Sequence, residues 1–233
     1  MPPDEPGART AATHSLTLDR GLRALEVLAA NRAGLSISEL AAALDTHRAA
    51  VYRLLGPLGD HHLVRRDGDG RFTLAPGLIE LAAAVQPRLH DVAEPVLRTL
   101  ADRFGATTAL TVRDGDGAVV SLVVAPRDAR MHLTYRTGMR HLLTQGAPGH
   151  ALLAAAPARA GEPADVAATR ARGYALTAGE LLPGATGVAA AIAAPGGRSE
   201  AAISVVWITG IDPEAAGAAV MTSATDIAAA LRC

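Results

Sequence analysis

Residues 35–64 read LSISELAAALDTHRAAVYRLLGPLGDHHLV and contain two short helical patterns joined by a tight connection. Ser36 can cap the first helix, and Glu39 stands three residues later, which is the capping-box pattern. The pair Asp45-Thr46 interrupts the apolar pattern, and Thr46 is a residue type that favours the start of a new helix. The stretch therefore predicts a helix, a short turn and a second helix.

The second helix of the pair has an apolar face and a polar face. Its apolar side chains recur at i, i+3, i+4 and i+7, which is the spacing of one buried stripe. They are Val51, Leu54, Leu55 and Leu58. The pair Gly56-Pro57 predicts that the regular helix ends near Leu55. The polar side carries Arg48, Ala49, Tyr52 and Arg53. These side chains suit insertion into a groove of DNA, and a plain helical hairpin with a solvated charged face is the alternative.

A basic β-hairpin follows the second helix. Residues 62–66 and 71–74 are short strand patterns, and Asp67-Gly68-Asp69-Gly70 between them is a strong turn signal. Arginines stand on both arms of the hairpin, at Arg65, Arg66 and Arg71. Because arginine binds both phosphate and guanine edges well, we interpret the hairpin as the wing of a winged helix-turn-helix.

The composition limits the classes to which the protein can belong. The chain has 233 residues and a formal net charge of -1, so contact with nucleic acid has to come from a local basic patch. Its one cysteine, Cys233, excludes a disulfide or a cysteine-based metal site within one chain. No stretch approaches the ~18 apolar residues of a membrane span, and residues 1–14 lack an apolar signal core. We therefore expect a cytoplasmic protein with no membrane partner.

The order of the patterns predicts four regions. Residues 1–15 read as a flexible arm, 16–75 as the winged helix-turn-helix, 76–88 as a linker helix and 89–233 as a larger second domain. In the last region, strand patterns cover residues 107–113, 118–124, 131–136, 189–194 and 201–208. Helical patterns cover residues 89–104, 151–156 and 213–231. Antiparallel strands mixed with helices predict an α+β fold class.

The linker region is unusually apolar. Residues 82–85 read AAAV, carry no charge and would be poorly placed in water. Dimerisation through this helix is the explanation we prefer. Burial against the second domain of the same chain explains the pattern equally well.

Several histidines raise the possibility of metal binding or acid–base chemistry. They are His61, His62, His132, His141 and His150. No two of them stand at a zinc-binding helical spacing with a carboxylate, and no nucleophile elbow occurs. We therefore expect no catalytic residue, no metal and no cofactor. The rival functions are a small-molecule enzyme with an incidental winged helix and a protein-interaction module, and the arginines of the helix and the wing argue against the second.

The chain resembles the IclR family of transcriptional regulators over nearly its whole length. In the first half the resemblance rests on LDRGL at 18–22, AAVYRLL at 49–55 and RFTL at 71–74. In the second half it rests on TGMR at 137–140, GHALLA at 149–154, RARGYA at 170–175 and AISV at 202–205. The resemblance implies a linker helix between a winged helix-turn-helix and a GAF-like effector domain with an antiparallel sheet. It also implies a homodimer or homotetramer that binds double-stranded operator DNA and responds to a small-molecule effector.

The resemblance assigns the DNA-reading positions by their place in the sequence. The recognition helix of the family corresponds to Arg48, Ala49, Ala50, Tyr52 and Arg53. The family usually has serine and threonine where this chain has Ala49 and Ala50. We therefore expect the readout to fall on Arg48, Arg53 and thymine-methyl contacts from the alanines.

The effector pocket is assigned in the same way. The pocket of the family maps onto Gly146, Ala147, Gly187, Ala189, Ser204 and Val206. Only Ser204 among them has a polar side chain, although the backbone N–H groups of a loop at Gly146 and Ala147 can bind a carboxylate. A pocket poor in polar side chains predicts an aromatic or apolar effector, such as an aromatic acid, over a small and strongly polar acid.

Overall fold

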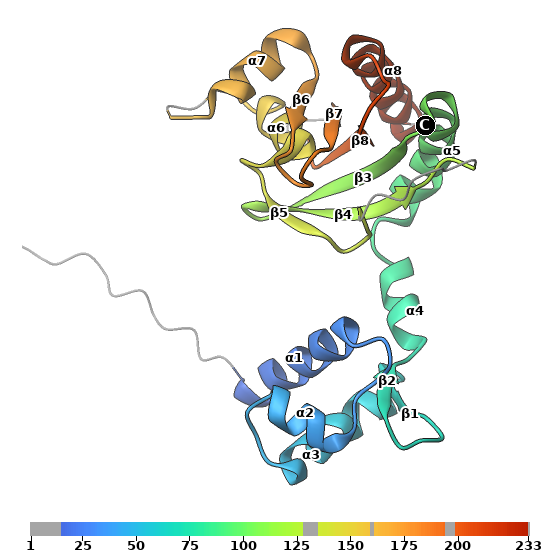
Figure 1. Cartoon of the computed structure of the whole chain (residues 1–233), viewed down its shortest axis with the longest axis vertical. Coiled ribbons are helices and arrows are strands. Elements are labelled where there is room, and N and C mark those ends of the chain that lie inside the picture. Colours follow the sequence, from blue (N-terminus) through green and yellow to red (C-terminus); the bar gives the residue numbers. More distant parts are fainter. Residues whose placement is uncertain (1–14, 128–134, 159–160, 194–198, 233) are drawn as a thin grey trace, which may run out of the picture. The chain divides into compact units, whose positions relative to one another are not determined.

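The structure is a computed structural model that describes residues 15–127, 135–158, 161–193 and 199–232. The chain divides into two compact units between Val85 and Gln86 (Figure 1). The predicted arm at residues 1–14 and Cys233 lie outside the described residues, and Ser15 caps the first helix. In the described part of the chain, none of the helices combines the length and the apolar character that crossing a lipid bilayer requires.

The first unit is a three-helix domain with a β-hairpin and a short helix after it. Its elements are α1 (Leu16–Ala30), α2 (Ile37–Ala43), α3 (Arg48–Asp60), β1 (Val64–Arg66), β2 (Phe72–Leu74) and α4 (Gly77–Ala83). Leu28 of α1, Leu40 of α2 and Val51 of α3 meet in one buried apolar cluster. The hairpin is antiparallel with Val64 opposite Leu74, and Leu35 adds a bridge to Phe72. The predicted winged helix-turn-helix is confirmed.

The start of α2 has the capping box that its sequence predicts. The Ser36 N–H donates to Glu39 Oε2 at 2.7 Å, and the Glu39 N–H donates to Ser36 Oγ at 3.3 Å. The backbone and hydroxyl of Ser36, and then the charge of Arg71, hold the pKa of Glu39 below its ordinary value. The contact therefore stabilises the fold at pH values above the ordinary pKa of a glutamate. This stabilisation is lost as the pH falls through the lowered pKa of Glu39.

The connection before α3 differs from its prediction, because α3 begins after His47 and not after Thr46. Asp45 is left-handed, with φ 47°, and its N–H bonds to the Ala42 carbonyl at 3.2 Å. The Thr46 N–H bonds to the Ala41 carbonyl at 2.9 Å. These two bonds form a Schellman closure of α2, in which Thr46 belongs to the end of that helix. The residue before α3 is then His47, which provides no side-chain cap.

The end of α3 also differs from its prediction. The helix continues to Asp60 with Pro57 inside it, although the sequence predicted an end near Leu55. Proline crowds the Cβ of the residue before it, and Gly56 has no Cβ, so the helical conformation remains accessible there. The His61 N–H donates to the Pro57 carbonyl at 3.0 Å, which shows that the helical bonds resume after the proline.

The second unit is an antiparallel sheet between helices. Its helices are α5 (Pro87–Phe104), α6 (Gly146–Ala154), α7 (Ala164–Arg172) and α8 (Pro213–Arg232). Its strands are β3 (Thr107–Asp114), β4 (Gly117–Val124), β5 (Arg140–Leu142), β6 (Ala175–Ala178), β7 (Thr186–Ile192) and β8 (Ala201–Trp207). Within the described residues the sheet has the order β5-β4-β3-β8-β7-β6, and every neighbouring pair is antiparallel. The α+β class with an antiparallel sheet is confirmed.

Helices cover both faces of this sheet (Figure 1). Ile203 and Val205 of β8 join the large apolar cluster that contains residues of α5 and α8. Ala202 of β8 and Ala189 of β7 belong instead to the cluster built around α6. Successive residues of a strand point to opposite faces, so β7 and β8 are buried on both sides.

Two predictions for the second unit need correction. Gly146 and Ala147, predicted as a loop, belong to the first turn of α6, where Pro148 fits because the first N–H groups of a helix need no intrahelical partner. Of the strand predicted over 131–136, residues 131–134 lie outside the described residues, and Tyr135 and Arg136 are not in a strand.

The capping box makes a testable contribution to stability. We expect Ser36→Ala to lower the free energy of unfolding of the first unit by about 1 kcal/mol, because the Glu39 N–H loses its acceptor. Hydrogen exchange of the α2 amides in the full chain measures the change. The matched control is Ser38→Ala, two residues further along and exposed. Equal protection in the two variants would show that the cap contributes nothing.

Candidate functional site

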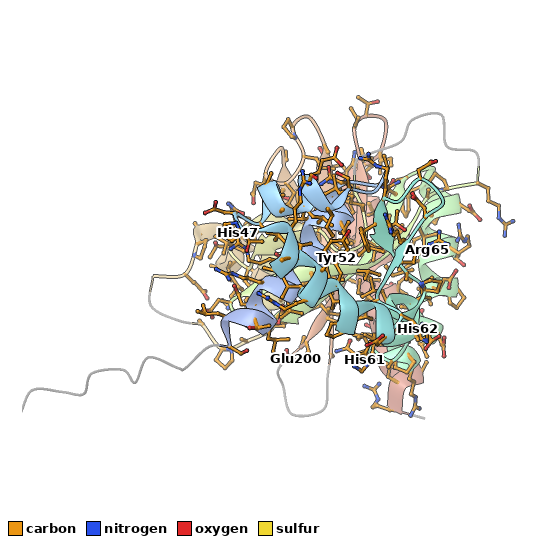
Figure 2. All side chains as sticks on the ribbon, turned by 90° about the horizontal axis from the view of Figure 1, so that it is seen from below. His47, Tyr52, His61, His62, Arg65 and Glu200 are labelled. Atoms are coloured by element: carbon orange, nitrogen blue, oxygen red, sulfur yellow. The ribbon has the colours of Figure 1, made fainter. Side chains whose placement is uncertain are left out.

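The exposed face of α3 collects the residues predicted to read DNA. Figure 2 shows His47 and Tyr52 along this helix and Arg65 on the hairpin that follows it. Arg48, Ala49 and Arg53 are exposed, Tyr52 is 53% exposed, and Ala50 is half-buried. Val51, Leu54 and Leu55 are buried on the opposite face. The polar face is therefore free, while the apolar stripe holds the helix to its own unit.

The arginines of this face are available for an external partner. Among the described residues, the guanidinium groups of Arg48, Arg53 and Arg65 have neither a hydrogen bond nor an ion pair. The N-terminus of α3 is also open, because His47 provides no side-chain cap. Free N–H groups at the positive end of a helix favour an anion such as phosphate. Sequence reasoning missed this feature because Thr46 was expected to cap the helix.

The two other arginines of the hairpin have internal partners. The Arg66 Nε donates to the Gly70 carbonyl at 3.2 Å, and its guanidinium lies 5.9 Å from the centre of the Phe72 ring. Arg71 donates from Nε and Nη2 to the Gly34 carbonyl at 3.2 and 2.9 Å, and its Nη2 lies 3.0 Å from Glu39 Oε2. The structure thus gives Arg71 an internal role, which is to hold the hairpin to the start of α2.

A second candidate site lies in the other unit, at the N-terminal end of α6. Four of the six residues mapped to the effector pocket line this cavity, and they are Ala147, Gly187, Ser204 and Val206. Gly146 is buried at the start of α6, and Ala189 is packed in the apolar cluster beneath that helix. The free volume is about 20 Å³, which is room for about one water molecule.

The polar lining of this cavity is richer than the sequence indicated. Tyr135, Thr177, Glu180 and Thr186 line it besides Ser204. This cavity therefore has more polar side chains than the mapped positions alone led us to expect. Thr177 belongs to β6 and Glu180 follows that strand. Sequence analysis found no strand pattern there, so it could not place either residue beside the cavity.

Three hydroxyl groups come together at the sheet side of the cavity. The hydroxyls of Tyr135, Thr111 and Ser204 are buried and lack a well-formed hydrogen bond in the described part of the chain. Burial raises the pKa of the Tyr135 phenol, and the neighbouring hydroxyls of Thr111 and Ser204 partly offset the rise. Buried polar groups without partners are costly, so this end of the cavity suits a polar group of a ligand.

Two larger hollows in the second unit lack such groups. One, of about 450 Å³, is lined by residues including Leu89, Ala193 and Leu231, and the other, of about 320 Å³, by residues including Ala155, Ala193 and Arg170. Among the described residues, neither hollow is lined by a buried polar side chain without a hydrogen-bond partner. The small cavity at α6 therefore has the better chemistry for recognising a specific ligand.

Potential metal-binding atoms also lie beside this cavity. Atoms of His150, Asp165 and Glu180 lie within 4.8 Å of one another. Glu180 Oε2 already accepts the Gly146 N–H at 2.7 Å, and His150 Nε2 lies 3.1 Å from the Thr144 carbonyl. Since Glu180 Oε2 and His150 Nε2 already have protein partners, the geometry supports hydrogen bonding at these two residues better than a metal site.

Comparisons with known proteins agree with the architecture of both units. Residues 17–68 match the model of the IclR helix-turn-helix domain. The chain is 31% identical over 215 residues to the HTH-type transcriptional regulator BhcR of Paracoccus denitrificans, covering 81% of this chain and 76% of that protein. It is 32% identical over 142 residues to the probable transcriptional regulator SauR of Cupriavidus necator, covering 59% and 56% of the two chains.

Solved structures show the same fold. An IclR transcriptional regulator from Alicyclobacillus acidocaldarius matches with a TM-score of 0.78 and 22% identity, over 93% of this chain and 99% of that one. An IclR homolog from Microbacterium hydrocarbonoxydans, solved in complex with 4-hydroxybenzoate, matches with a TM-score of 0.77 and 23% identity, over 93% and 99%.

The role of Arg71 can be tested directly. We expect Arg71→Ala to speed hydrogen exchange of the Leu35 and Phe72 amides about fivefold, because about 1 kcal/mol of partly exposed, charge-assisted bonding is lost. Arg65→Ala on the same hairpin is the control and should leave these amides protected. Equal exchange in both variants would mean that Arg71 does not hold the hairpin.

Proposed function

The chain belongs to the IclR family of transcriptional regulators, and on this premise we propose which surfaces bind DNA and which cavity senses a ligand. As a member of the family it is a DNA-binding transcriptional regulator whose activity responds to a small molecule. The observation that carries the DNA assignment is the free polar face of α3 above a fully buried apolar stripe.

We propose that α3 enters the major groove of operator DNA. Arg48 and Arg53 then hydrogen-bond to base edges, and Ala49, Ala50 and Tyr52 contact apolar edges such as thymine methyl groups. Arg65 and Arg66 of the hairpin bind phosphate, which positions the helix without reading sequence. Unpaired guanidinium groups and an uncapped helix N-terminus support this arrangement, because neither has an internal anion to displace.

We propose that the protein acts as a homodimer, which can pair further into a homotetramer. Leu18 and Leu22 of α1 are 63% and 52% exposed, and they lie one helical turn apart. Ile79 and Leu81 of α4 and the nearby Val85 are also mostly exposed. Exposed large apolar side chains on two helices of this unit support an interface with a second copy, because association would remove them from water.

We propose that the cavity at α6 binds a small organic acid as the effector. The polar groups at the two ends of this cavity are the N–H groups that begin α6, which bond to Glu180 and Thr177 in the structure, and the hydroxyls of Tyr135 and Ser204. The Microbacterium protein was solved with 4-hydroxybenzoate, which carries a carboxylate at one end and a phenol at the other. The carboxylate of that molecule can accept hydrogen bonds from N–H groups, and its phenol can hydrogen-bond to hydroxyls. A carboxylate with a second polar substituent is therefore the class of ligand we infer.

The relatives named above are regulators, and the cavity contains groups for binding a ligand. We therefore propose no catalytic role for the unit that contains it. Conversion of a bound acid into a product by the purified protein would overturn this part of the proposal.

The DNA assignment is tested with Arg53→Ala. The probe is a duplex selected from a random pool by the unchanged protein, with binding followed by fluorescence anisotropy at fixed salt. Loss of one arginine contact to a base should weaken specific binding by about 5- to 150-fold, which corresponds to about 1–3 kcal/mol. Arg23→Ala, on the exposed side of α1, is the control and should bind normally. Unchanged affinity of Arg53→Ala would remove α3 from the interface.

The effector assignment is tested at Gly187. A Cβ there would lie 3.8 Å from the Ala147 Cβ and 3.9 Å from Val206, so Gly187→Ala should fit and keep ligand binding. Gly187→Leu should extend into the cavity and reduce binding of 4-hydroxybenzoate, measured by calorimetry, at least tenfold while DNA binding stays normal. If Gly187→Leu and Gly187→Ala bind the acid equally well, the effector site lies elsewhere.

A further inference from the structure

The cavity at α6 already contains a carboxylate that belongs to the protein. We propose that Glu180 is a built-in competitor of the effector, and that an organic monocarboxylate binds by displacing the Glu180 side chain from the N-terminus of α6. This inference rests on the proposed function, which gives the cavity an acidic ligand. The ligand has to replace a carboxylate, so Glu180 favours a ligand that is itself a carboxylate. Glu180 also determines the concentration at which that ligand binds.

Glu180 occupies the position in which the sequence placed an effector carboxylate. Its Oε2 accepts the Gly146 N–H at 2.7 Å, and the Thr177 hydroxyl accepts the Ala147 N–H at 3.0 Å. Gln145, which precedes α6, provides no side-chain cap. The first N–H groups of α6 are therefore satisfied by residues that come 30 and 34 positions later in the chain.

The segment that carries Glu180 also closes the cavity. Leu181 lies so near Gly146 that a Cβ on this glycine would come within 2.4 Å of Leu181 Cδ1. Leu181 and Leu182 both line the cavity, whose free volume of about 20 Å³ is too small for an organic acid. Movement of residues 180–183 would open the cavity to a ligand, and that movement would take Glu180 away from α6.

Glycines stand at both ends of this segment. Gly179 and Gly184 have φ of 74° and 77°, and a Cβ built on either would meet no atom within 4 Å. Glycine adopts many backbone conformations at little cost, so the two positions can take up the rotation that moves residues 180–183. The Glu180 side chain is 32% exposed, which gives its carboxylate a way into solvent.

A separate observation indicates that the cavity is built for a ligand. Tyr135 and Ser204 line it with buried hydroxyls that have no well-formed hydrogen bond, and their side chains are 6% and 0% exposed. Glu180 satisfies the α6 end of the cavity, and the hydroxyls at the other end have only poorly formed contacts with one another. A monocarboxylate with a hydroxyl or carbonyl substituent can satisfy both ends, so this ligand outcompetes an internal group that reaches only one of them.

The test compares the affinity of acids with that of neutral analogues. The probes are 4-hydroxybenzoate and its amide, 4-hydroxybenzamide, measured by calorimetry on the full chain in the presence of EDTA. EDTA prevents a cation held by His150, Asp165 and Glu180 from contributing to binding. Glu180→Ala should bind the acid about tenfold to a hundredfold more tightly than the unchanged protein, because the acid no longer has to displace an internal carboxylate from α6. Glu180→Gln, which keeps the shape and loses the charge, should show a smaller gain.

The controls separate charge competition from simple blockage. Leu181→Ala widens the cavity and leaves Glu180 in place, so the acid and the amide should gain equally. Glu214→Ala, in the exposed first turn of α8, should change neither affinity. Thermal unfolding without ligand shows whether Glu180→Ala still folds, and Glu180→Gln provides the comparison if it does not.

The outcomes distinguish this inference from the proposed function. If the unchanged protein binds the acid and Glu180→Ala binds it no more tightly, Glu180 is not a competitor and the organic-acid site stands. Equal gains for the acid and the amide in Glu180→Ala would also overturn the inference, because Glu180 would then only fill space. If neither the unchanged protein nor any variant binds the acid, the proposed effector class fails and this inference fails with it.

Discussion

Strand β8 is buried along its whole length because helices cover both faces of the sheet, and this constraint determines where a ligand can be recognised. Ile203 and Val205 face the apolar cluster of α5 and α8, where any polar atom would be costly. Ala202, Ser204 and Val206 face the opposite way, toward α6. A buried hydroxyl in the middle of a strand has a desolvation cost, so apolar packing does not explain Ser204, and our proposal gives this residue a role in ligand recognition.

The same alternation explains how much of the fold could be predicted. The apolar stripe of α3, the capping box at Ser36 and the hairpin turn at residues 67–70 are local patterns, and all three appear as the sequence indicates. The errors lie where two local signals compete for one residue. Thr46 can start α3 or complete the closure of α2. The Schellman bonds from Thr46 and Asp45 to the Ala41 and Ala42 carbonyls show that it does the second. Pro57 does not end α3 because the preceding residue, Gly56, has no Cβ for the proline ring to crowd. A prediction from the proline alone does not take this into account.

The candidate ligand site was harder to predict than the fold, because its parts are distant in the sequence. Ala147, Gly187, Ser204 and Val206 could be placed through family resemblance, and they line the cavity. Thr177 and Glu180 belong to or follow β6, a four-residue strand of weak pattern, and their bonds reach back 30 and 34 residues to α6. Periodicity carries no information about such bonds. The effector class inferred from the sequence was therefore based only on the mapped positions, which are the less polar part of the cavity lining.

Glu39 and Glu180 both bond to backbone N–H groups at the start of a helix, and the difference between these two contacts bears on the proposed function. Glu39 and Ser36 are three residues apart, so closing their contact costs little chain entropy, and Arg71 adds a second partner that ties the hairpin to it. Glu180 reaches Gly146 from 34 residues away, on a segment that is bounded by glycines, and the opposite end of its cavity keeps unsatisfied hydroxyls. The first contact is held by the nearby Ser36 backbone and hydroxyl and by the Arg71 guanidinium. Under our proposal, a ligand replaces the second contact with a net gain of hydrogen bonds, and this difference in binding between two states is what a sensor requires.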